Sequence, residues 1–214
     1  MNVSFSRVSR LGSLLLAAAL LTACGNGPPP RLYLLEPHAL EPSTEQNVGE
    51  GAKVQKRSAS GLSSLGVASV TLPGYASGAQ IASLSANGTV TQEDGHRWAE
   101  EPAVAIGRLL VNRLRERADA TVLSEPWPRD YQPGARVKVV FDRLLREPNG
   151  GADMSGQILL LSGDGRNLLK TVPFEFVLYG RDTARRVFFV AVSQGIDDIA
   201  RMAIEALKGM ELKS

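Results

Sequence analysis

The sequence has little of what most enzymes use. Its 214 residues include one cysteine, Cys24, and two histidines, His38 and His96. One cysteine cannot form a disulfide within the chain or supply a cysteine-ligated zinc site. A His-Glu-x-x-His pair, a phosphate-binding glycine loop and a Gly-x-Ser-x-Gly motif are also missing. We therefore expect a protein that is not an enzyme, with no catalytic residues, no metal ligands and no cofactor.

Carboxylates can supply acid–base chemistry without a recognisable motif, and Asp94 and Asp153 are examples. The chain has 22 acidic residues, so pairs of them arise easily by chance. A hydrolase based on carboxylates or a serine therefore stays open as an alternative.

The sequence also lacks an apolar run long enough to cross a membrane. The longest run, from Leu11 to Ala23, is shorter than the roughly 20 residues that a spanning helix needs. Arg7 and Arg10 precede it and no acidic residue does, which is the layout of a secretory signal. We expect residues 1–23 to be a signal peptide.

The end of this run, Leu21-Thr22-Ala23-Cys24, is followed by Gly25 and Asn26 and resembles the lipobox of bacterial lipoproteins. The resemblance implies that the Cys24 thiol is acylated, for example with palmitate, and becomes the new N-terminus. Two or more acyl chains hold a protein firmly on a membrane, whereas one chain binds marginally. The residue after the cysteine is Gly25 rather than Asp, which in such lipoproteins favours the outer membrane. The alternative is an ordinary signal peptide cleaved elsewhere.

An excess of charge of one sign is missing as well. Residues 1–23 hold two of the 24 Lys and Arg residues and none of the 22 acids, so the mature chain has 22 of each. A formally neutral protein without a basic stripe is not expected to bind nucleic acid.

Behind Cys24, residues 24–30 contain three consecutive prolines and are expected to form a stiff lipidated tether. Residues 31–36 are predicted as a short strand. The polar segment 38–64 has almost no large apolar side chains and is expected to be flexible. If strand 31–36 joins the sheet, the tether is about six residues and reaches at most about 20 Å. Otherwise some 40 flexible residues span about 35 Å. We favour the short tether and expect residues 31–214 to form a single periplasmic domain.

The rest of the chain alternates between strand-like and helix-like patterns. Apolar residues recur at helical spacing from Pro102 to Leu114 and again within residues 182–210. Locally, residues 187–192 could also form a strand. The arginines on the other face of the first helix, Arg108 to Arg117, are interpreted as a solvated face rather than a binding site. Strands are predicted at 65–72, 80–85, 89–92, 120–124, 136–146, 154–162 and 168–179.

Two glycine-containing breaks divide the last three predicted strands, at residues 149–151 and 163–165, and both suit tight turns. This pattern predicts an antiparallel meander, and Asn87-Gly88 predicts a two-residue hairpin turn between 80–85 and 89–92. The expected fold class is α+β, a sandwich-like arrangement in which two amphipathic helices pack on a mixed, largely antiparallel sheet.

Two further stretches contain aromatic residues that are unusual in this sequence. Pro73 and Tyr75 lie in the first, and Arg97 and Trp98 lie in the second, His96-Arg97-Trp98-Ala99-Glu100. Such aromatics can simply cover the sheet edge and the helix start. Alternatively, aromatics beside an arginine are enriched at protein interfaces. Pro73, Tyr75, Arg97 and Trp98 are therefore candidate interface residues.

The strand-Pro-x-Tyr block followed by Gln80-Ile81, and then the His96–Glu100 block before an apolar helix, resemble the ABC-type transport auxiliary lipoproteins, also called PqiC-like lipoproteins. The tyrosine-containing segment Leu32–Leu35 is similar to the first strand of that family. The polar segment 38–64 looks longer than the usual connection.

The resemblance implies a non-enzymatic outer-membrane lipoprotein. Such a protein would work with an MCE-domain protein and its membrane partner in moving phospholipid between the two bacterial membranes. Because MCE assemblies are ring-like, a ring-like homo-oligomer is also an expectation. A purely structural envelope lipoprotein remains the other alternative, besides the hydrolase.

Overall fold

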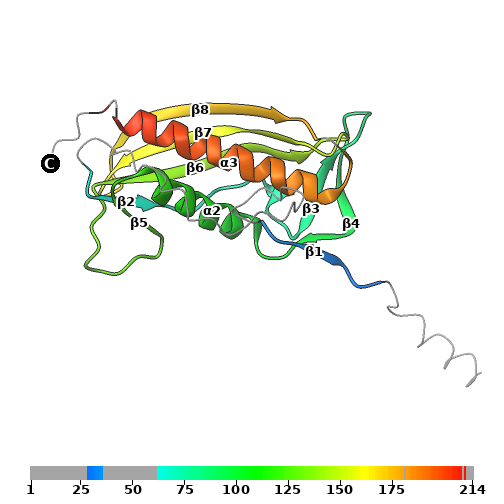
Figure 1. Cartoon of the computed structure of the whole chain (residues 1–214), viewed down its shortest axis with the longest axis horizontal. Helices are drawn as coiled ribbons and strands as arrows, with labels where there is room; N and C mark the ends of the chain where they lie inside the picture. The colour runs from blue at the N-terminus through cyan, green and yellow to red at the C-terminus, as the bar shows by residue number, and fades with distance from the viewer. Residues whose placement is uncertain (1–27, 36–61, 181, 209, 211–214) are drawn as a thin grey trace, which may run out of the picture. The chain divides into compact units, whose positions relative to one another are not determined.

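Strand β6 (Ala135–Arg146) is the centre of the sheet in the computed structural model, which describes residues 28–35, 62–180, 182–208 and 210. One edge of β6 pairs along its length with β7 (Ala152–Ser162). β7 pairs in turn with β8 (Leu168–Leu178). Both pairings are antiparallel, so the predicted meander is confirmed (Figure 1).

The other edge of β6 is shared by two short strands. β2 (Ser64–Val67) pairs in parallel with the first residues of β6. β3 (Gln80–Leu84) meets the last residue of β6. Between them, Thr71 forms an isolated parallel bridge with Val140. β2 and β3 therefore lie one after the other along the same edge of β6, and each starts its own part of the sheet.

Three more strands extend these halves. β5 (Thr121–Ser124) pairs in parallel with β2. β4 (Val90–Trp98) pairs antiparallel with β3. β1 (Arg31–Tyr33) pairs in parallel with the end of β4. The long pairings are antiparallel and the short ones are mostly parallel, as expected for a mixed, largely antiparallel sheet.

The alternation along β6 explains which face of the sheet carries the core. Val137, Val139 and Phe141 are buried, whereas Lys138 is half-buried and Asp142 is exposed. Successive side chains point to opposite faces of a strand, so one face of β6 is apolar and the other is polar. The apolar face is covered by helices.

Those helices are α2 (Pro102–Arg117) and α3 (Arg185–Lys208). They pack against each other, while α3 lies on β7 and β8 and α2 lies on β5 (Figure 1). The predicted stripe of α3 is buried from Phe189 to Leu207, so the helical interpretation is confirmed and the strand alternative for 187–192 is wrong. α2 begins at Pro102, which suits a first helical turn because that position needs no N–H partner. The α+β fold with two helices on a sheet is confirmed.

Several predicted boundaries need correction. The predicted strand 65–72 ends at Val67, because the chain then leaves the regular ladder and makes only the Thr71 bridge. The 80–92 hairpin is present, but the Ser85 N–H donates to the Thr89 carbonyl, so the turn encloses three residues rather than two. Within it, Gly88 has a positive φ of 82°, which favours glycine. β4 also runs six residues beyond the predicted end at 92, to Trp98.

The predictions for the signal peptide, for Cys24 and for most of segment 38–64 fall outside the described residues. Contacts group Arg31–Ser214 into one compact unit. In the described part of the chain, no helix is both long and apolar enough to cross a membrane.

Candidate partner-binding surface

Trp98 lies in the core rather than on a surface. Its side chain is 5% exposed, and its ring meets Phe188 and Phe189 of α3 edge-on, with centroids 5.9 and 4.7 Å apart. Edge-to-face pairs of this kind stabilise a core beyond the area they bury. Trp98 is therefore a core residue that packs β4 against α3. The prediction that it is an interface residue was wrong. Trp98 joins the end of β4 to the start of α3.

Arg97 points the other way. Trp98 faces the helices, so its neighbour on the strand occupies the opposite face of the sheet, and Arg97 is exposed there. Its register partners are Leu32 of β1 and Gln80 of β3. In the described part of the chain Arg97 has no ion-pair partner. It presents a free guanidinium on the sheet face that no described helix covers.

Tyr75 and Pro73 lie beside β4 and β6. Tyr75 belongs to η1 (Gly74–Ala76), a short 3-10 helix capped by Pro73, and both residues are half-buried. The Tyr75 carbonyl accepts a hydrogen bond from the side chain of Gln92 at 2.8 Å, and its hydroxyl lies 3.4 Å from the backbone N of Leu144. These contacts attach η1 to β4 and β6. Tyr75 also packs against the hydrophobic core, whereas Arg97 and Trp98 lie on opposite faces of β4.

The β3–β4 pair also carries a largely buried acid that sequence reasoning missed. Glu93 of β4 accepts hydrogen bonds from Nη1 of Arg146 at 3.1 Å, from Nε of Arg185 at 2.8 Å and from the Ser83 hydroxyl. Arg146 also donates to the Thr183 carbonyl at 2.6 Å. The cluster ties β3, β4 and the end of β6 to the start of α3. Nothing in the polar stretch around Glu93 signalled its burial.

Opposing effects act on the acidity of Glu93. Burial raises its pKa, but hydrogen bonds from Ser83 and Arg185, together with the charges of Arg146 and Arg185, lower the pKa below the ordinary value of 4.5. Glu93 is therefore a charged structural group in the folded protein at neutral pH.

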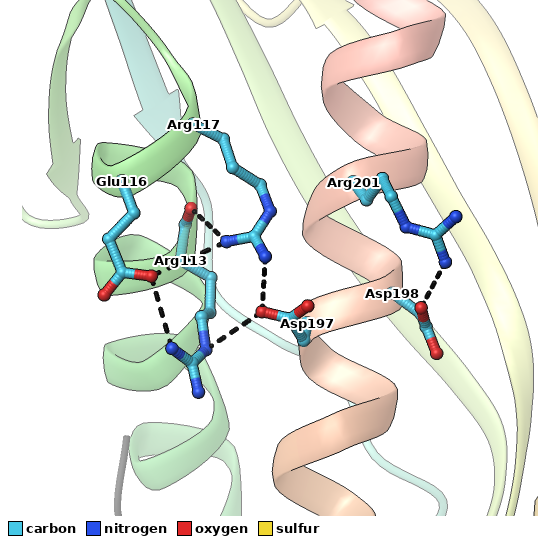
Figure 2. Close-up of polar contacts among 6 residues, drawn as sticks. All are labelled: Arg113, Glu116, Arg117, Asp197, Asp198 and Arg201. Carbon is cyan, nitrogen blue, oxygen red and sulfur yellow. Dashed lines mark hydrogen bonds and ion pairs between the residues drawn. The ribbon is translucent and has the colours of Figure 1, made fainter. Parts of the chain in front are cut away.

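The arginines of α2 are not a solvated face, which corrects the sequence interpretation. Arg113 and Arg117 both contact Asp197 of α3, at 3.2 and 2.6 Å, and Glu116 lies beside them (Figure 2). Arg115 donates to the carbonyl of Val122 at 2.9 Å. Arg108 pairs with Glu100 and donates to the carbonyl of Leu35. These contacts join α2 to α3, to β5 and to the segment after β1. Their common function is packing.

A groove runs along α2, and Arg108 and Arg115 are among its lining residues. It has a volume of about 470 Å³ and lies between α2 and residues 67–70. A second recess of about 540 Å³ shares Ser69 and Glu125 with it and extends to Trp127, over which Arg136 stacks at 5.0 Å from the ring centroid. The walls are mixed, with apolar, acidic and basic groups, and do not define one ligand chemistry.

The carboxylates considered for catalysis do not form a site. Asp153 is buried and pairs with Arg143 at 3.2 Å, whereas Asp94 is exposed on β4. Burial and the charge of Asp153 raise the pKa of Glu147, against the effect of Arg143. In the described ranges, no three His, Cys, Asp or Glu residues are placed to hold a metal ion.

The comparison with protein families gives one decisive match. Residues 47–203 match the family model described as the ABC-type transport auxiliary lipoprotein component. The chain belongs to this family. A search of curated proteins finds no match. The family resemblance in the sequence is therefore confirmed, and membership identifies the chain as an auxiliary transport lipoprotein.

Solved structures agree on the fold. An uncharacterized protein matches with a TM-score of 0.59 and 19% identity over 67% of this chain and 90% of its own. A protein from Xanthomonas campestris matches with a TM-score of 0.57 and 13% identity over 68% and 85%. PelC from Paraburkholderia phytofirmans, a dodecamer, matches with a TM-score of 0.44 and 10% identity over 68% of this chain and 87% of its own. This likeness is too distant to carry an argument.

Proposed function

We propose that this family member is a non-enzymatic, outer-membrane-anchored periplasmic lipoprotein that assists an MCE- and ABC-type system in moving phospholipid between the inner and outer membranes. Its partners would be an MCE-domain protein and the membrane partner of that protein. The domain would hold the distal end of the MCE assembly at the outer membrane.

The observation that carries this proposal is the position of β1. The strand pairs with β4, and Arg31 begins it. Only the six residues after Cys24 separate the proposed acylation site from the sheet, a reach of at most about 20 Å. An acylated Cys24 would therefore keep the domain next to the membrane surface, which suits a docking role better than a diffusing carrier or enzyme.

Arg97, Tyr75 and Pro73 are the proposed docking residues. Arg97 lies on the sheet face that no described helix covers, and no ion pair with another described residue engages its guanidinium, while Tyr75 and Pro73 are half-buried at η1. Arginine and tyrosine are the residue types that most often dominate binding energy at interfaces. Trp98 contributes only by fixing the end of β4.

Self-association into a ring is a separate part of the proposal. Among the described strands β8 pairs with β7 alone, so no described strand covers its other edge, and Leu168 at its start and Tyr179 just after its end are exposed. Such an edge can pair with another chain. Native mass spectrometry of the detergent-extracted protein would show one closed oligomer if the proposal holds and only monomers if it does not.

Copurification tests the partner. The lipidated protein, tagged at its C-terminus, is extracted from membranes in mild detergent, and the proteins that come with it are identified by mass spectrometry. We expect an MCE-domain protein, and a large loss of it with Arg97→Glu. Arg166→Glu is the matched control, because Arg166 is exposed in the β7–β8 turn. Recovery of the lipoprotein alone would favour a structural lipoprotein, and turnover that survives clean purification would favour a hydrolase.

A further inference from the structure

β1 and the two residues after it expose two leucines, Leu32 and Leu34. Leu32 is 62% exposed and Leu34 is 52% exposed, whereas Leu35 is 1% exposed and Tyr33 stacks on Phe189 with centroids 5.3 Å apart. Tyr33 and Leu35 therefore attach this segment to the domain, while Leu32 and Leu34 remain exposed. Scattered exposed leucines are ordinary, but two neighbours on one short edge segment form a patch.

The patch lies close along the chain to the proposed lipid anchor. Leu32 follows Cys24 by eight positions, so the intervening chain can extend at most about 28 Å. An acylated Cys24 would have its acyl chains in the bilayer. The leucines are thus within reach of the bilayer surface from the moment the protein is anchored.

Two cations flank the leucines. Arg31 is exposed at the start of β1, and Arg97 is the register partner of Leu32 on the same sheet face. Neither has an ion-pair partner in the described part of the chain. Apolar side chains bordered by basic ones are typical of surfaces that sit in the interface of an anionic bilayer, where the apolar groups enter the acyl boundary and the cations meet phosphates.

We propose that Leu32 and Leu34 insert into the membrane interface, with Arg31 against lipid phosphates and Arg97 at the border of this contact. The inference rests on the proposed anchoring through Cys24. The acyl chains hold the protein, and this contact sets the orientation of the domain. It places the sheet face that carries Arg97 beside the membrane, where a partner that delivers lipid would have to dock.

The test uses the mature lipidated protein in vesicles of phosphatidylcholine and phosphatidylglycerol. A Leu34→Cys variant carries an NBD fluorophore on its one free thiol, since Cys24 is acylated. A Val104→Cys variant is the matched control, because Val104 is 54% exposed on α2, outside both the β1 surface and the β8 edge. Vesicles with brominated acyl chains report insertion at position 34, because only a probe at the acyl boundary meets the quencher.

We expect a blue-shifted emission and about twofold quenching at position 34, and an unshifted, unquenched signal at position 104. Phosphatidylcholine alone should reduce the quenching at 34, as should Arg31→Glu. Equal emission and quenching at the two positions would overturn the inference. A blue shift at position 34 without quenching would also overturn it, because it would indicate contact with protein, such as a second copy of the chain, rather than with lipid. Flotation of the vesicles in a density gradient separates the insertion of Leu32 and Leu34 from the anchoring through Cys24. Protein that floats without quenching contradicts only this inference, whereas protein that does not float contradicts the anchor as well.

Discussion

Nη1 of Arg146 donates to the Glu93 carboxylate at 3.1 Å, and neither side chain is more than 10% exposed. This pair joins the end of β6 to the middle of β4. Arg185 adds the start of α3 through its own bond to Glu93 at 2.8 Å. The half of the sheet that carries the proposed docking residues is therefore fastened to the helical layer by charge as well as by the packing of Trp98.

Removal of Glu93 should destabilise the fold severely. Glu93→Ala leaves Arg146 buried without its acid, and breaking a buried pair from one side typically costs about 3 to 5 kcal/mol. Urea unfolding monitored by circular dichroism measures the loss. The control is Asp94→Ala, an exposed neighbour, where a change within about 0.5 kcal/mol is expected. Similar values for the two variants would show that the cluster does not stabilise the fold.

The same cluster predicts a pH dependence. The pKa of Glu93 is lower in the folded protein than its ordinary value of 4.5, so the unfolded chain binds a proton first as the pH falls. The stability that Glu93 contributes is then fully present above about pH 4.5 and is lost as the pH falls through the lower, folded pKa. Unfolding free energies of wild type and Glu93→Gln should differ at neutral pH and converge in acid. A constant difference across this range would contradict the account.

Substitutions at Trp98 and Arg97 should have different effects, one on the free energy of unfolding and the other on partner binding. Trp98→Ala removes a buried ring and should cost about 3 to 5 kcal/mol of unfolding free energy. The Arg97 side chain is exposed, so Arg97→Ala should change the free energy of unfolding by less than about 0.5 kcal/mol while the amount of captured partner falls. Thermal unfolding and copurification of the same samples make the comparison. A strongly destabilised Arg97→Ala would mean that Arg97 is structural.

Gly156 should not tolerate alanine. A Cβ at this position on β7 would lie 2.1 Å from the carbonyl oxygen of Val140, a backbone atom of β6. The strands would have to shift apart, and overpacking of this kind costs about 1 to 3 kcal/mol. Gly78→Ala is the control, because a Cβ there meets nothing within 4 Å. Equal unfolding free energies for the two variants would contradict the close approach of β6 and β7.

The meander and both helices could be predicted because their signals are local. Alternating apolar residues mark β6, glycine turns separate β6, β7 and β8, and a continuous apolar stripe marks α3. The shared edge of β6 could not be predicted, since parallel pairing between distant short strands leaves no mark in either segment.

The candidate surface was predicted only in part. Arg97 and Trp98 were grouped because they are neighbours in sequence, but neighbours on a strand face opposite sides. The polar residues before them hid the extension of β4 to Trp98, so this alternation could not be applied. Glu93 was also missed, because it lies in the same hidden extension of β4. Its three partners come from β3, β6 and α3, which are distant in the sequence.

The most direct test of the central claim is site-specific photo-crosslinking in intact cells. A benzophenone amino acid replaces Arg97, and in a matched variant it replaces Leu168 on β8. We predict that position 97 forms a covalent adduct with an MCE-domain protein and that position 168 does not. Adducts of position 97 with no MCE-domain protein, in cells that produce both proteins, would contradict the account.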